Sequence, residues 1–61
     1  MAHEQKLLNL RDVVAMTTLS RATVYRFIRG GVFPRAVRIG PRRVAWLESD
    51  VIGWMTARQP N

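Results

Sequence analysis

Cysteine is absent from this chain of 61 residues, and histidine occurs only once, as His3. Without cysteine the fold has no disulfide to supplement its core and no thiolate ligand for a structural zinc site. His3 lies in a polar segment at the start of the chain, and Glu48 and Asp50 are better explained as the start of a helix than as an acid–base pair. We therefore expect no metal, no cofactor and no enzymatic activity.

Long apolar runs are missing as well. The longest stretches without charge, such as residues 13–20, fall far short of the roughly 20 apolar residues that a membrane-spanning helix needs. The start of the chain also lacks the apolar segment of a secretory signal. These absences predict a soluble, cytoplasmic protein with no membrane partner. The length allows one small domain, which we expect over residues 7–59 after a disordered tail of residues 1–6.

Acidic residues are scarce, with four Asp and Glu against ten Lys and Arg, which gives a net charge of +6. Nine of the ten basic residues are arginine. In a small domain this excess indicates a polyanionic partner, because the planar guanidinium suits paired contacts with phosphate or with the edge of guanine. Simple solubilisation is the alternative, so the positions of the arginines have to decide.

The first half of the chain predicts two short helices that meet at a tight turn. Asn9 has the character of an N-cap, and the apolar spacing that follows it indicates a helix over 10–17. Ser20 is the N-cap candidate for a second helix over about 21–29, which the glycine pair at 30 and 31 ends. The two leucines before Asn9 either form a short strand or simply pack on the core.

The second half predicts a hairpin and a closing helix. Val37, Ile39, Val44 and Trp46 alternate with other residues around the turn at 40–43, which is typical of two strands with one buried face. Helical spacing then resumes over about 49–58. Gly53 inside that helix suggests either close packing against another element or a weak helix.

These elements in this order predict a small α+β fold: a winged helix-turn-helix with three short helices and a two-stranded antiparallel wing. On the second helix, Val24, Phe27 and Ile28 share one side and basic residues occupy the other. In such a fold the helix over 21–29 enters the major groove of DNA, and the wing over about 38–44 reaches the backbone or an adjacent groove. The candidate DNA-binding residues are Ser20, Arg21, Ala22, Thr23, Tyr25, Arg26, Arg29, Arg38, Arg42 and Arg43.

Four motifs carry a resemblance to a known family: the run 19–31, Phe33-Pro34-Arg35, Arg38-Ile39-Gly40, and Val44-Ala45-Trp46 with Val51 and Trp54. Together they cover nearly the whole chain. The sequence resembles the AlpA-like prophage regulators, which are close to phage excisionases and to the DNA-binding half of MerR-type proteins. The resemblance implies a bacterial or phage origin and a role as transcription regulator or excisionase. It also implies that the main DNA contacts are Ser20, Arg21, Thr23 and Arg26, assisted by the arginines of the wing.

Other interpretations stay open beside this one. The alternative is a basic face that docks on an acidic protein, for example an integrase or RNA polymerase, and self-association of copies on DNA is also left open. Single-strand or RNA binding is less well supported, because Trp46 and Trp54 fall in apolar patterns typical of a core. Tyr25 either contacts the DNA backbone or packs against the wing, and Arg35 and Arg58 are either functional or ordinary surface charges.

Overall fold

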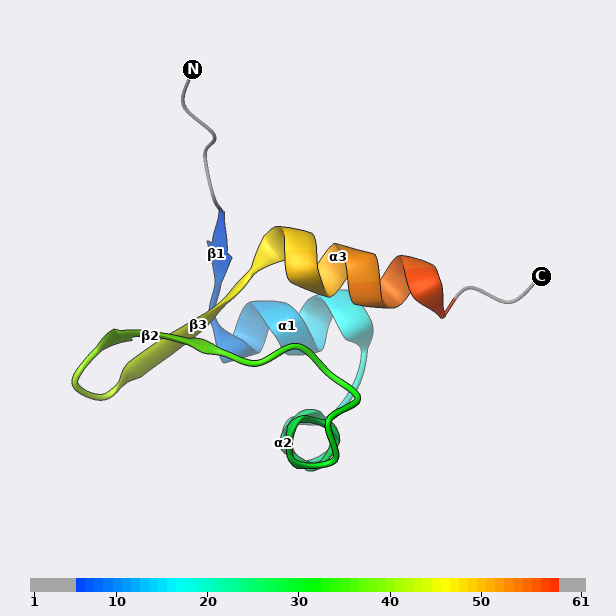
Figure 1. Ribbon diagram of the computed structural model, residues 1–61, viewed down its shortest axis with the longest axis horizontal. Helices are drawn as coiled ribbons and strands as arrows, with labels where there is room; N and C mark the ends of the chain where they lie inside the picture. The colour runs from blue at the N-terminus through cyan, green and yellow to red at the C-terminus, as the bar shows by residue number, and fades with distance from the viewer. Residues whose placement is uncertain (1–5, 59–61) are drawn as a thin grey trace, which may run out of the picture.

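Three helices and a small antiparallel sheet form the fold in the computed structural model, which describes residues 6–58 (Figure 1). This confirms the predicted small α+β winged helix-turn-helix. In chain order the elements are β1 (Leu7–Leu8), α1 (Leu10–Thr17), α2 (Arg21–Arg29), β2 (Val37–Gly40), β3 (Arg43–Leu47) and α3 (Glu48–Ala57). The bounds of α1 and α2 are as predicted, and α3 begins and ends one residue earlier than expected. None of the helices in this part of the chain is long and apolar enough to cross a membrane.

The caps predicted for the first two helices are present. The Asp12 N–H donates to Asn9 Oδ1 over 2.8 Å and the Asn9 N–H donates to Asp12 Oδ2 over 3.2 Å, which completes a capping box at the start of α1. The Thr23 N–H donates to Ser20 Oγ over 3.1 Å at the start of α2. Between the helices, Thr18 takes a left-handed conformation with φ 63°. The chain turns sharply there, so α2 is seen end-on in Figure 1 while α1 lies along the plane of the picture.

The sheet has the order β1-β3-β2, so β1 adds a third strand to the two-stranded wing. Leu8 pairs with Trp46, and Leu7 pairs with Leu47. The Glu48 N–H donates to the Lys6 carbonyl over 2.9 Å and extends this pairing to the start of α3. The expected tail of residues 1–6 otherwise lies outside the described residues.

The core lies where β3 meets the three helices. Trp46 is its largest member and is fully buried, as are Val13 of α1, Val24 of α2 and Val51 of α3. Each helix therefore contributes one fully buried valine around a single aromatic ring. Burial of such side chains stabilises a fold by roughly 1.5–3 kcal/mol each, so these contacts fix how α2 sits on the rest of the domain.

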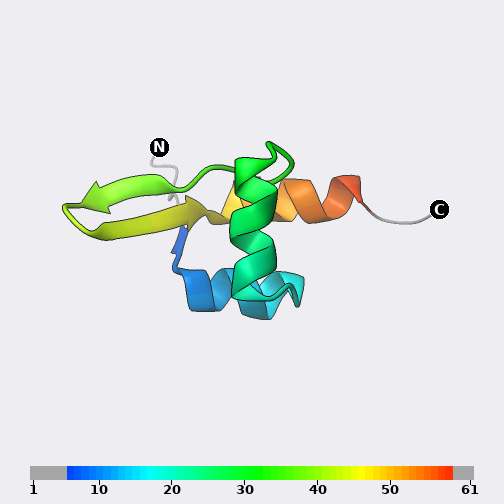
Figure 2. The same ribbon diagram turned by 90° about the horizontal axis from the view of Figure 1, so that it is seen from below.

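The prediction that the apolar residues of the hairpin form a buried face holds for Trp46, which is fully buried, and was wrong for the other three. Val37, Ile39 and Val44 are 40%, 45% and 43% exposed. The hairpin projects beyond the helices in Figure 2, so no helix among the described residues lies over its outer half. The pairing of residue 38 with Val44 and of residue 40 with residue 43 also leaves Ile39 as the extra residue of a bulge, which interrupts the alternation.

Candidate nucleic-acid interface

The outer side of α2 carries most of the candidate residues. Its apolar side packs on the core through Val24, with Phe27 and Ile28 partly buried beside it. Thr23 is partly exposed, and the exposed side chains of α2 are those of Arg21, Ala22, Tyr25, Arg26 and Arg29. Tyr25 is 41% exposed, so part of its side chain is open to solvent. Helical spacing thus separates the core side of α2 from its basic side.

The N-terminus of α2 is organised around two hydroxyl groups. Ser20 Oγ accepts the Thr23 N–H and donates to Thr23 Oγ1 over 2.9 Å. Because a hydroxyl has a single proton, the Ser20 hydroxyl is already used as a donor within the helix. The hydroxyl proton of Thr23 is not used in this pair of hydrogen bonds. Thr23 is therefore better placed than Ser20 to donate to an anion at the positive end of the helix dipole.

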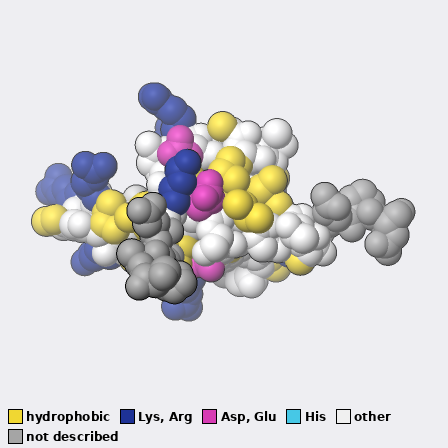
Figure 3. All heavy atoms as spheres, turned by 90° about the horizontal axis from the view of Figure 1, so that it is seen from above, with side chains coloured by type: hydrophobic (Ala, Val, Ile, Leu, Met, Phe, Trp, Pro, Cys, Tyr) yellow, Lys and Arg dark blue, Asp and Glu magenta, His cyan; other side chains and the backbone are white. Residues whose placement is uncertain are grey.

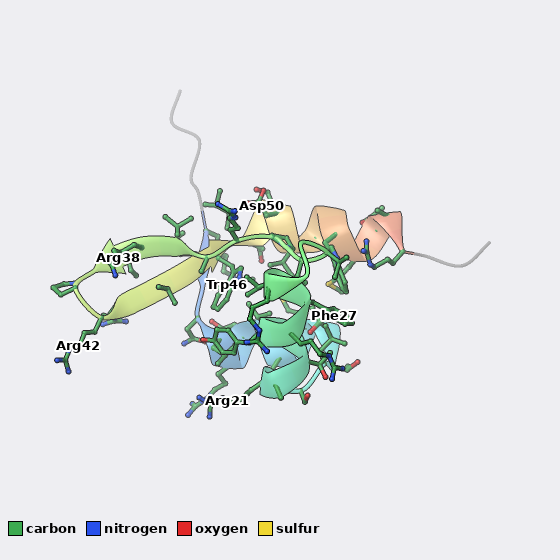
Figure 4. The ribbon with its side chains drawn as sticks, turned by 60° about the horizontal axis from the view of Figure 1, so that its bottom comes forward. Arg21, Phe27, Arg38, Arg42, Trp46 and Asp50 are labelled. Carbon is green, nitrogen blue, oxygen red and sulfur yellow. The ribbon has the colours of Figure 1, made fainter. Side chains whose placement is uncertain are left out.

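The wing supplies a second group of cations. Arg38 on β2, Arg42 in the turn and Arg43 at the start of β3 are all exposed. In Figure 4, Arg42 and Arg21 extend toward one side of the molecule, and Asp50 lies on the opposite side. The wing and the start of α2 therefore present positive charge in the same direction.

The charge of the chain is strongly divided. Between Asp12 and Glu48 the sequence holds seven arginines and no acidic residue. Within residues 6–58 the only ion pair joins Lys6 Nζ to Glu48 Oε2 over 3.9 Å, away from α2 and the wing. Figure 3 shows acidic side chains beside an apolar area on the face turned away from α2. No carboxylate in this part of the chain neutralises the arginines of α2 and the wing, so a polyanion can do so.

Arg11 is a basic residue that the sequence did not single out. It lines a depression of about 320 Å³ together with Arg21, and Leu10 and Val14 complete the lining. The helix-turn-helix geometry brings the first turn of α1 next to the first turn of α2. The position of Arg11 in the first turn of α1 could have indicated this role. Helical spacing alone, however, does not tell which residues of that turn face α2.

Arg58 is not an ordinary surface charge. Its guanidinium lies 4.2 Å from the centroid of the Trp54 ring, and its Nη2 donates to the Val32 carbonyl over 3.3 Å. Arg35 is exposed as well, and among residues 6–58 it makes no ion pair.

Comparison with known proteins gives matches over most of the chain. The sequence model of the family described as "Prophage CP4-57 regulatory protein (AlpA)" matches residues 6–59. A protein of Enterobacteria phage P4, "Uncharacterized protein ORF88", is 42% identical over 55 residues, which are 90% of this chain and 62% of the phage protein. The chain therefore spans less than two thirds of that relative. The "DNA-binding transcriptional activator AlpA" of Escherichia coli strain K12 is 27% identical over 59 residues, covering 87% of this chain and 84% of that protein.

Proposed function

The chain belongs to the AlpA family of prophage regulatory proteins, and from that membership we propose that it is a regulator that binds double-stranded DNA in a sequence-specific manner. The observation that carries this proposal is the common exposure of all six arginines of α2 and the wing, on a stretch of chain without acidic residues. The E. coli relative is named a DNA-binding transcriptional activator, which supports the same partner.

In this proposal, one set of residues contacts the DNA phosphates and another set contacts the bases. Arg21, Thr23 and the wing arginines bind phosphates on either side of the groove and set the register. Arg26, with Ala22 and Tyr25 beside it, faces the base edges in the major groove. A single domain of this size reads only a short site, so specific binding requires several copies on repeated sites or a protein partner.

Of the two biological roles expected from the sequence, transcriptional regulation is favoured over excision by the name of the E. coli relative. RNA polymerase is then the corresponding protein partner, whereas excision requires an integrase. A promoter reporter and an excision assay, each carried out with the same DNA-binding-deficient variant, separate these roles.

Fluorescence anisotropy tests duplex binding directly. The purified protein is titrated into labelled duplex from upstream of its own gene and into a scrambled duplex of equal length. Tighter binding to the natural duplex is expected, and Arg26→Ala is expected to weaken it roughly tenfold and to reduce the preference for it. Lys6→Ala is the matched control, because it removes one positive charge outside α2 and the wing and should change the affinity less than about twofold. Equal losses for both variants would mean that net charge alone is responsible.

Salt dependence gives a second test of the same surface. Neutralisation of about five phosphates corresponds to a slope near −4.5 in a plot of log K against log salt concentration. The double variant Arg42→Ala/Arg43→Ala should make the slope less steep by about 2. A slope near zero for the parent protein would contradict the proposed mechanism, and an unchanged slope in the variant would remove the wing from the interface.

A further inference from the structure

The connector between α2 and the wing, residues 30–36, contains no helix or strand, but several of its backbone groups form hydrogen bonds with the rest of the domain. The Val32 N–H donates to the Phe27 carbonyl of α2 over 2.9 Å. The Val32 carbonyl accepts from the Trp54 indole Nε1–H and from Arg58 Nη2, both supplied by the C-terminal part of α3 and the residue after it. The two backbone polar groups of a single residue therefore join α2 to the end of α3.

A second indole holds the next part of the connector. Trp46 Nε1–H donates to the Pro34 carbonyl over 3.1 Å, and Figure 4 places Trp46 between the base of the wing and α2. Phe33 lies between Val32 and Pro34, whose carbonyls accept these bonds, and it is only 5% exposed. Its ring packs edge-on against the Trp54 ring, with 4.8 Å between the ring centroids. Arg58 lies over the same ring. Both tryptophans thus donate hydrogen bonds to the connector through their indole N–H groups and pack on the core through their rings.

We propose that Trp54 and Arg58, together with Trp46, are positioning residues that fix the direction of the wing relative to α2. The outer part of the wing contributes no buried side chain to the core of residues 6–58, because Val37, Ile39 and Val44 remain 40–45% exposed. Its direction therefore depends on the base of β3 and on the connector. A connector of seven residues without these bonds would let the wing sample many directions relative to α2. Fixing it in advance reduces the ordering cost when both elements engage one partner.

Trp54 is the residue through which this can be tested without removing the core. Trp46 is fully buried, so its replacement would disturb the whole fold, whereas Trp54 is only partly buried. Trp54→Phe removes the N–H donor and keeps a ring against Phe33 and Phe27. Asn9→Ala is the matched control, because it weakens the cap of α1 and touches no part of the connector.

The position of the wing is measured first, without DNA. Since the chain has no cysteine, nitroxide labels attach only where cysteine is introduced, at the exposed residues Ile39 on the wing and Ala22 on α2. Pulsed electron paramagnetic resonance should give a narrow distance distribution in the labelled parent and in Asn9→Ala, and a clearly broader or shifted one in Trp54→Phe. An unchanged distribution in Trp54→Phe, with the variant folded by circular dichroism, would overturn the proposal.

The effect on binding rests on the proposed DNA-binding function and is measured by a double-mutant cycle. Trp54→Phe alone should weaken duplex binding roughly three- to tenfold, and it should weaken Arg42→Ala/Arg43→Ala less than about twofold, because that variant has already lost the contacts that the connector positions. Equal losses in both backgrounds would show that Trp54 acts on the fold alone. If the parent binds no duplex, the proposed function fails, whereas the spin-label distances still decide whether the connector is fixed.

Discussion

Substitution of Gly53 with alanine should stabilise this protein, although the position lies inside a helix that contacts the core. Gly53 is exposed in the middle of α3, and a methyl group added there would meet no atom within 4 Å beyond its chain neighbours and the backbone of its own helix. Its φ is not positive, so alanine adopts the same backbone without strain. The possibility that this glycine serves close packing against another element is therefore wrong, and it is simply a weak helix residue.

The expected gain follows from helix propensity alone. Glycine in a helix interior is about 1 kcal/mol less favourable than alanine, and no packing term opposes the change at this site. For a domain of this size, 1 kcal/mol corresponds to a rise in Tm of roughly 4–8 °C. Thermal unfolding followed by circular dichroism at 222 nm measures this shift, with urea unfolding as an independent measure of the free energy.

Gly31→Ala is the matched control, since it is the same chemical change at an exposed glycine with φ 78°. Space is available there too, but the left-handed conformation costs an alanine roughly 1–2 kcal/mol, so this variant should unfold at a lower temperature. Opposite signs for the two variants are the expected result. A lower Tm for Gly53→Ala, or a higher one for Gly31→Ala, would refute the reasoning from local conformation.

Three further changes follow from the turn and the caps. Thr18→Gly should raise stability by roughly 0.5–1 kcal/mol, because a β-branched residue with φ 63° is replaced by one that tolerates it, and urea unfolding measures the gain. Asn9→Ala should cost about 1 kcal/mol in the same assay through loss of the capping box, without changing duplex affinity. Ser20→Ala should cost a similar amount and should also weaken duplex binding, because the hydroxyl orients Thr23; unchanged binding would limit Ser20 to its role as a cap.

Local chemistry made the helices of this fold predictable. Asn9 and Ser20 begin α1 and α2 with side-chain bonds to the third residue, and the glycine pair ends α2, so their bounds agree with the expectation. The separation of Val24 from Arg26 follows equally from the angular spacing of helix residues. These features depend on residues a few positions apart, which is the range over which sequence patterns are informative.

Features that depend on long-range contacts were not predictable in the same way. Alternation placed the apolar residues of the hairpin on one face, but it contains no information on whether another element covers that face, and Val37 and Val44 remain exposed. The pairing of β1 with β3 and the proximity of Arg11 to Arg21 also arise from tertiary packing. The bonds from Trp54 and Arg58 to Val32 join residues more than twenty positions apart, and the apolar pattern suggested only a core role for the tryptophan.

The division of α2 into two sides has a practical consequence for changing what this protein recognises. Its packing on the domain depends on Val24 and its apolar neighbours, whereas Ala22, Tyr25 and Arg26 point away from the core. Substitutions at such exposed positions usually alter stability by less than about 0.5 kcal/mol. Ala22 offers the most room, because only a methyl group now stands there and a longer side chain would extend into solvent. A library randomised at these three positions would therefore sample new surface chemistry on an unchanged scaffold.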